Sequence, residues 1–136
     1  MPAKKIKTKT VEKSRYRAYL KKAEEFYETA LSAQEPNNWN AVGLNAVHCA
    51  ISSADSLLVF YTGKRSSDES HQAVVELLKL IELPDVRSKA ETLRKVLEKK
   101  NLVAYEDREF SRNDALQIIK LAERFLAWVK SILSKA

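Results

Sequence analysis

The chain has 136 residues, a length that favours a single domain with its own hydrophobic core. Gly occurs twice, Pro three times and Cys once, which excludes a disulfide framework and a sheet built from tight hairpins. The formal net charge is +6, and residues 1–17 alone carry seven Lys or Arg against one acid, so the remainder is close to neutral.

Residues 1–13, MPAKKIKTKTVEK, are basic and contain no apolar run, which predicts a flexible arm and no secretory signal. Such an arm either binds phosphate groups or only keeps the chain soluble, and the second role is the more common one. The folded domain is expected over residues 14–136.

The first two helices are predicted over about residues 10–33 and 39–62. Pro36, in the break QEPNNWN, stops the first helix, and Asn37 or Asn38 can cap the second. The second helix is apolar over most of its surface, so we expect it to be the central one.

Three further helices follow the loop GKRSSDES. The third is expected to end near Leu83, and the fourth begins at Pro84 and continues to about Asp107. The motif SRND resembles a capping box ahead of the fifth helix, which is expected over Asn113 to about Ser134. Short connections favour antiparallel neighbours, so we predict an all-α, up-and-down bundle of about five helices.

The second helix carries a polar stripe. Asn45, His48, Ser52 and Asp55 are spaced three, four and three residues apart, which places them on one face. These residues make the helix too polar for a membrane span, so we expect no membrane association. The single Cys49 fits a reducing, cytoplasmic location.

The fourth helix has a complementary anomaly. Its apolar stripe of Val86, Ala90, Leu93 and Leu97 continues into Lys100, with Asn101 beside it and Tyr105 further along. Buried polar groups need partners, so we expect Asp55 or its neighbours to meet Lys100 or Asn101, within the subunit or across a dimer interface. Such a meeting is either a buried polar network that fixes packing or a small ligand cleft.

Other chemistries have weaker support. His48 and Cys49 are adjacent on a helix and point about 100° apart, so they do not form a nucleophile–base pair. One helix face does not give triad geometry to His48, Ser52 and Asp55. His71 is expected in an exposed first turn, in contact with solvent. One Cys and two His exclude a structural zinc site, and we expect neither a metal nor a cofactor.

Two long segments resemble HEPN domains. The runs are NAVHCAISSADSLLVFYTGKRSSDESHQAVVELLK and KNLVAYEDREFSRNDA followed by LAERFLAWVKSIL, and the resemblance covers about residues 14–133. It implies a small α-helical bundle that is commonly a homodimer. Many members are metal-independent ribonucleases, often toxins paired with a nucleotidyltransferase antitoxin, and others bind RNA, nucleotides or proteins without catalysis.

The resemblance also implies where a ribonuclease site would lie. Catalytic members carry an Arg, usually a polar residue after it, and a His five positions after the Arg. These positions are Lys100, Asn101 and Tyr105 here, and a Tyr that some members carry two residues past the His is Asp107. Only Asn101 matches the pattern.

The two departures weaken an enzymatic interpretation. Tyr ionises near pH 10 and is a poor base at neutral pH, and Lys lacks the bidentate fork with which Arg binds phosphate. We therefore favour a non-catalytic or weakly catalytic module that binds a nucleotide, RNA or a partner such as a nucleotidyltransferase. The alternative is a divergent metal-independent ribonuclease that uses Lys100, Tyr105 and His48. The ligand residues proposed from the sequence are Asn45, His48, Ser52, Asp55, Lys100, Asn101 and Tyr105.

Overall fold

A computed structural model describes the backbone of residues 5–105 and 108–136 and the side chains of residues 5–101 and 108–136. Its elements in chain order are β1 (Thr8–Thr10), a short 3-10 helix (Lys13–Arg15), α1 (Tyr16–Ser32), α2 (Trp39–Thr62), β2 (Lys64–Ser66), α3 (Gln72–Lys79), α4 (Val86–Tyr105) and α5 (Arg112–Lys135).

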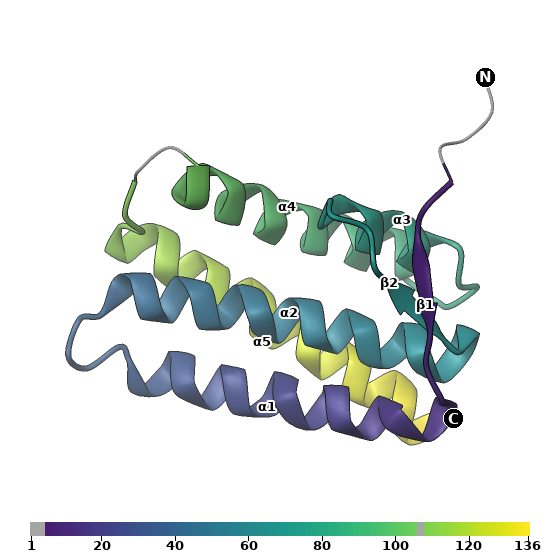
Figure 1. Cartoon of the computed structure of the whole chain (residues 1–136). Helices are drawn as coiled ribbons and strands as arrows, with labels where there is room; N and C mark the ends of the chain where they lie inside the picture. The colour runs from purple at the N-terminus through teal and green to yellow at the C-terminus, as the bar shows by residue number, and fades with distance from the viewer. Residues whose placement is uncertain (1–4, 106–107) are drawn as a thin grey trace.

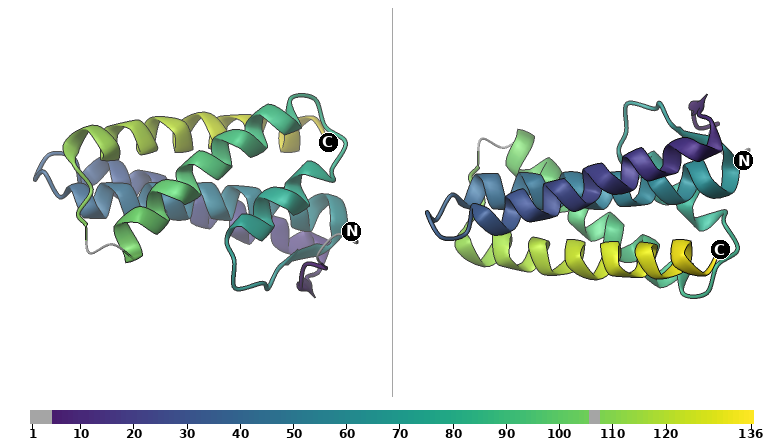
Figure 2. Two further views of the ribbon diagram at one scale, coloured as in Figure 1. Left: turned by 90° about the horizontal axis from the view of Figure 1, so that it is seen from above. Right: turned by 90° about the horizontal axis from the view of Figure 1, so that it is seen from below.

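The four long helices form an antiparallel bundle, which confirms the predicted all-α fold. α1, α2, α4 and α5 alternate in direction along the chain (Figure 1). α4 runs obliquely to the other three, and the short α3 lies at one end beside the two strands (Figure 2). Short connections between long helices permit this arrangement, as the sequence predicted.

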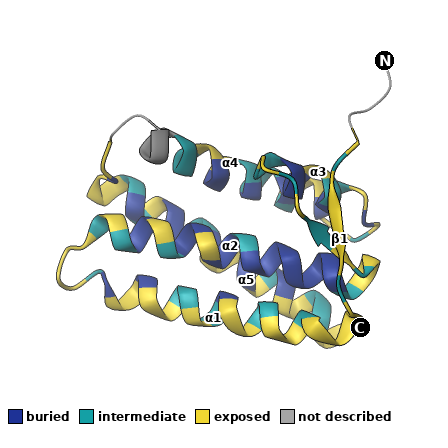
Figure 3. Cartoon of the chain, viewed as in Figure 1, coloured by how far each residue is buried: buried dark blue, intermediate teal, exposed yellow. Residues whose placement is uncertain are grey.

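α2 is the central helix. Residues 52–59 are all buried, and most of the helix is dark blue in Figure 3. It packs chiefly against α1 and α5 and also contacts α3 and α4. The helix ends at Gly63, whose φ of 68° is the left-handed conformation that glycine adopts without strain. Its predicted bounds are confirmed.

The ends of the other helices follow local chemistry. Ser111 caps α5, because its side chain accepts a hydrogen bond from the Asp114 amide at 3.0 Å, as the SRND motif indicated. α3 ends at Lys79, earlier than predicted, and α4 begins at Val86, after Asp85 with a φ of 64°. The left-handed residue turns the chain between the two helices.

A two-stranded ribbon replaces part of the expected arm and loop. Thr8, Lys9 and Thr10 pair antiparallel with Ser66, Arg65 and Lys64. Backbone hydrogen bonds extend the pairing on both sides, from Val11 N to the Gly63 oxygen at 2.8 Å and from Ser67 N to the Lys7 oxygen at 3.0 Å. Residues 8–10 therefore differ from the flexible arm that composition alone indicated, because a distant segment supplies partners for their backbone groups.

The apolar composition of α2 is explained by its position. By length and hydropathy alone this helix qualifies as a membrane span, contrary to the expectation that its polar residues make it too polar. However, 78% of the qualifying window is buried inside the bundle. A central helix packed on several sides needs apolar residues for the same reason that a spanning helix does.

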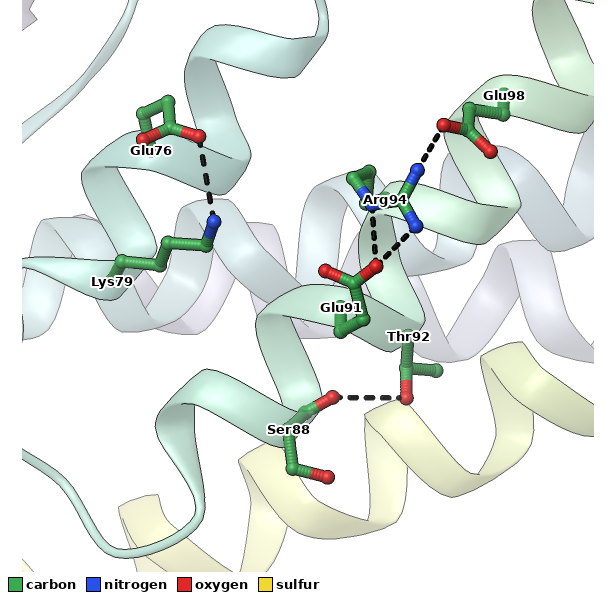
Figure 4. A network of polar contacts seen from close by, with 7 residues as sticks. All are labelled: Glu76, Lys79, Ser88, Glu91, Thr92, Arg94 and Glu98. Atoms are coloured by element: carbon green, nitrogen blue, oxygen red, sulfur yellow. Dashed lines mark hydrogen bonds and ion pairs between the residues drawn. The ribbon is translucent and has the colours of Figure 1, made fainter.

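The outer surface of α4 carries an ion-pair network. On α4, Arg94 forms ion pairs with Glu91 and Glu98, which lie one turn before and one turn after it (Figure 4). A separate pair lies within the neighbouring α3, where Lys79 Nζ is 3.5 Å from the Glu76 carboxylate. Exposed pairs at this spacing support a helix only weakly. The network therefore helps to keep the outer face of α4 helical while its inner face contacts the core.

Candidate functional site

A lysine and a histidine meet at the inner side of α4. Lys100 Nζ lies 2.6 Å from His71 Nε2, and both side chains are half-buried. An ammonium group has no lone pair and must donate, so His71 accepts through Nε2 and carries its own proton on Nδ1. Burial and the Lys100 cation together lower the pKa of His71, which keeps the imidazole neutral near pH 7.

A second imidazole completes the cluster. His48 on α2 is exposed, and its ring lies 5.4 Å from the Phe26 ring. Its ring is nevertheless partly removed from water against Phe26, and this partial burial, followed by the charge of Lys100, lowers the pKa of His48. His48 in turn contributes to the lowered pKa of His71. Burial also lowers the pKa of Lys100. We call His48, His71 and Lys100 the basic cluster.

The basic cluster brings together three elements. His48 comes from α2, His71 from the residue before α3, and Lys100 from α4. Burial lowers all three pKa values, the charge of Lys100 lowers those of both imidazoles further, and His48 adds to the shift of His71. No acid contributes to these shifts among the side chains that the structure describes. Basic side chains grouped at a partly open surface are suited to bind an anion.

A cleft of about 270 Å³ adjoins the cluster through His71. Its lining includes Asp55 and Ile51 of α2, Arg65 of β2 and the loop before α3. Asp55 is buried, and its carboxylate lies 3.9 Å from the Arg65 guanidinium. Burial raises the pKa of Asp55 to about 6, because the cost of removing the carboxylate from water exceeds the stabilisation from Arg65 and Lys22.

The polar stripe of α2 therefore meets two different partners. His48 lies within electrostatic range of Lys100, whereas Asp55 pairs with Arg65 and not with Lys100 or Asn101. Within one subunit, the predicted meeting of Asp55 with Lys100 is therefore wrong, and a meeting across a dimer interface stays a prediction. His48 and Asp55 are seven residues apart, or about 10 Å along the helix, so the end of α4 that reaches the first does not reach the second.

The remaining predicted residues have separate environments. Asn45 is half-buried and donates to the Ala41 carbonyl of its own helix at 2.8 Å. Ser52 is buried on α2 between His48 and Asp55, and Asn101 is half-buried beside Lys100. The side chain of Tyr105 lies outside the described residues. Of the ligand residues proposed from the sequence, His48 and Lys100 therefore belong to the basic cluster among the described side chains. His71 is a member that the sequence did not propose.

His71 was expected in an exposed first turn, and it is instead half-buried. The signal that could have identified it is its helical spacing, because Val74, Val75 and Leu78 at three, four and seven residues further on are all buried. A histidine in that register lies on the inward face. Its partner, however, comes from α4 and could not be read from this spacing.

The N-terminal segment holds the loop that carries His71. Lys7 N lies 3.4 Å from the Asp68 carboxylate, and the other carboxylate oxygen accepts from Ser70 N at 3.1 Å. Asp68 N in turn donates to Ser66 Oγ at 3.1 Å. These bonds tie the residues immediately before His71 to the ribbon, so the ribbon positions the imidazole against Lys100.

Removal of residues 1–13 should therefore change the site more than the fold. We expect the helical circular dichroism spectrum to be retained, because the long helices pack without the ribbon. The pKa of His71, followed by NMR titration, should rise toward its ordinary value of 6.5 as the imidazole leaves Lys100. A chain without residues 1–4 is the control and should titrate as the full chain does. An unchanged His71 titration in the longer deletion would contradict the positioning role of the ribbon.

A comparison with protein-family models decides the relationship of this chain. The model described as HEPN domain matches residues 16–132. The chain belongs to the HEPN domain family. No curated protein and no solved structure matches it. The family match extends from the start of α1 nearly to the end of α5 and so includes all three members of the basic cluster.

In this HEPN domain, the position that carries Arg in the ribonucleases it resembles is Lys100. The structure places this residue against an imidazole, His71, which comes from another part of the chain than Tyr105. Asp107 lies outside the described residues. A lysine and a neutral imidazole are therefore adjacent here, although the sequence pattern lacks the His at its usual position.

The HEPN domain shows no arrangement of three or more His, Cys, Asp or Glu side chains suited to a metal ion among its described residues. Cys49 is buried in the core, and burial raises the pKa of its thiol to about 12. A thiol held neutral in this way is a poor nucleophile. The basic cluster is thus the described group with the strongest case for binding chemistry.

Proposed function

We propose that this HEPN domain binds a phosphate-bearing ligand, a nucleotide or a phosphate group of RNA, through His48, His71 and Lys100. The observation that supports this most is the 2.6 Å contact between Lys100 Nζ and His71 Nε2. It joins a cation and an imidazole at a partly exposed position, with no acid among the causes of their lowered pKa values in the described residues.

The electrostatics give the proposal its physical reason. The charge of Lys100 lowers the proton affinity of both imidazoles, and His48 lowers that of His71, so protonation of the imidazoles in the unliganded cluster is unfavourable. A phosphate placed between the groups would neutralise Lys100 and favour protonation of the imidazoles, which would then donate to phosphate oxygens. The proposed binding is therefore coupled to proton uptake and should tighten as the pH falls below 7.

Replacement of Lys100 by Met tests the proposal. We expect AMP binding, measured by isothermal titration calorimetry, to be abolished. The free energy of unfolding should change by less than about 0.5 kcal/mol, because no acid partner of Lys100 is left unpaired in the described structure. Lys95→Met is the matched control, since Lys95 is exposed on the same helix and should not affect binding. Equal AMP affinity in Lys100→Met and the unchanged chain would refute the proposal.

A divergent metal-independent ribonuclease remains the second candidate, and the His71 contact is the observation that favours it. A neutral imidazole beside a phosphate-binding Lys has the pKa range of a general base that could activate a ribose hydroxyl. The same preparations should be incubated with RNA in the presence of EDTA. We expect no cleavage. Cleavage that is lost in Lys100→Ala, and in either His71→Ala or Tyr105→Phe, would replace the binding proposal by the enzymatic one.

The expected homodimer, nucleotidyltransferase partner and cytoplasmic location remain predictions. Leu44 on α2 is 39% exposed one turn before His48, so this face offers an apolar contact next to the basic cluster. Two-fold pairing there would place two clusters close together.

A further inference from the structure

A second group of cations lies away from the basic cluster, on the ribbon and the start of α1. Five of its members are exposed, and Arg65 is half-buried. The group, which we call the basic face, consists of Lys9, Lys13, Arg17, Lys22, Lys64 and Arg65. Figure 1 shows β1 and β2 beside the end of the bundle where α1 begins.

The basic face is strongly unbalanced in charge. Residues 5–22 contain eight Lys or Arg and a single acid, Glu12. Among the described residues, Arg65 is the only member of the face with an ion pair, to Asp55. Lys9 and Arg65 are directly opposite in the ribbon, where like charges destabilise strand pairing. A bound polyanion would relieve this repulsion.

Aromatic rings alternate with these cations. Lys13 Nζ lies 4.3 Å from the centre of the Phe60 ring, and that ring contacts Tyr16 edge-on at 5.0 Å. The Tyr19 ring has Lys22 at 5.7 Å and Arg65 at 5.9 Å. Cations interleaved with aromatic rings suit single-stranded nucleic acids, because the cations bind phosphates and the rings stack on unpaired bases.

The basic face is continuous with the cleft next to the basic cluster. Arg65 belongs to the face, contacts Tyr19 and also lines the cleft. His71 lies on the same cleft and contacts Lys100. A chain of phosphates that follows the face past Arg65 would therefore reach His71 and Lys100.

We propose that the basic face binds the backbone of a single-stranded RNA, whose chain continues past Arg65 into the cleft at His71. This inference rests on the proposed function for the far end of the path, and it specifies a polymer as the ligand. The near end, on the ribbon and α1, is independent of Lys100. An anionic membrane is less suitable, because four of the six cations, Lys13, Arg17, Lys22 and Arg65, lie over aromatic rings.

Fluorescence anisotropy with a labelled oligouridylate tests this proposal. The double variant Lys9→Ala and Lys64→Ala removes two exposed charges from the face. The slope of log affinity against log salt should become less negative by about 1.4, because each phosphate contact with a single strand contributes about 0.7. The control is the double variant Lys95→Ala and Lys120→Ala, which removes the same charge from α4 and α5. Its slope should stay more negative than that of the ribbon variant.

The stacking component has its own matched pair. Tyr19→Ala should weaken oligouridylate binding by roughly five- to 150-fold, the range that corresponds to removal of one base–aromatic stack. Tyr19→Phe keeps the ring and should restore the affinity. Binding that is equally weak in both variants would contradict stacking on this ring.

Three results would overturn the proposal. They are the same salt slope in the ribbon variant and its control, equal affinity for duplex and single-stranded RNA, and binding to phosphatidylserine vesicles without binding to RNA. Failure of the proposed function is separable from these. If the oligomer binds with the ribbon-dependent slope while AMP does not bind, the basic face stands and the assignment of the basic cluster fails.

Discussion

Replacement of Phe110 by alanine should lower the free energy of unfolding by about 3–5 kcal/mol, the usual cost of a large cavity in a core. Phe110 lies in the segment between α4 and α5, yet only 3% of it is exposed. Its amide donates to the Asn40 side chain at 2.8 Å, and its ring covers Gly43 of α2. The measurement is urea unfolding monitored by circular dichroism.

The contact between the ring and Gly43 gives a stringent check. A Cβ atom at position 43 would lie 2.6 Å from the Phe110 ring, closer than van der Waals contact allows. Gly43→Ala should therefore cost about 1–3 kcal/mol through overpacking. In the double variant with Phe110→Ala the clash disappears, so the combined loss should be smaller than the sum of the single losses.

Leu80→Ala is the control for an apolar side chain outside the core. Leu80 is 76% exposed, and its removal should change stability by no more than about 0.5 kcal/mol. Additive losses in the Gly43 and Phe110 pair would show that the two residues do not touch. The packing of Phe110 matters for the site, because it anchors the start of the segment before α5 to α2, the helix that carries His48.

Asp55→Asn should stabilise the domain at pH 7 and remove a pH dependence of its stability. Burial raises the pKa of Asp55 from 3.8 to about 6 in the folded chain. The folded state therefore binds this proton more tightly than the unfolded state. The resulting stabilisation is complete below about pH 3.8 and is lost as the pH rises through about 6. The loss amounts to about 3 kcal/mol at 1.4 kcal/mol for each pKa unit.

Unfolding by urea at pH 4 and at pH 7 measures this effect. The free energy of unfolding of the unchanged chain should be lower at pH 7 than at pH 4 by an amount that Asp55→Asn does not show. Glu25→Gln on the exposed face of α1 is the control and should retain the fall. Arg65→Ala should enlarge it, because Arg65 is the cation in ion-pair distance of the carboxylate. An identical pH dependence in Asp55→Asn and the unchanged chain would contradict the raised pKa.

The linkage also connects stability to the proposed ligand. Arg65 neutralises Asp55 and belongs to the basic face, so a phosphate that attracts Arg65 would compete with the carboxylate. The buried acid thus limits how far Arg65 can move toward a ligand without a cost to the fold at neutral pH.

The sequence by itself determined the helices and the inward position of Lys100. Side-chain periodicity is a local property, so the apolar stripes and the break around Pro36 were sufficient to predict α2 and nearly all of α5. The same periodicity placed Lys100 among core positions of α4. The family resemblance was legible for the same reason, because it depends on runs of residues within single helices.

The tertiary structure decided which groups meet. His71 contacts Lys100, and Asp55 contacts Arg65, across elements whose relative placement depends on packing of the whole bundle. Thr8–Thr10 form a strand only because Lys64–Ser66 offer backbone partners from a distant part of the chain. Local propensity for such short strands is weak, and their pairing is set by long-range contacts that no periodic pattern encodes. The ribbon and the partner of Lys100 were therefore beyond prediction from the sequence.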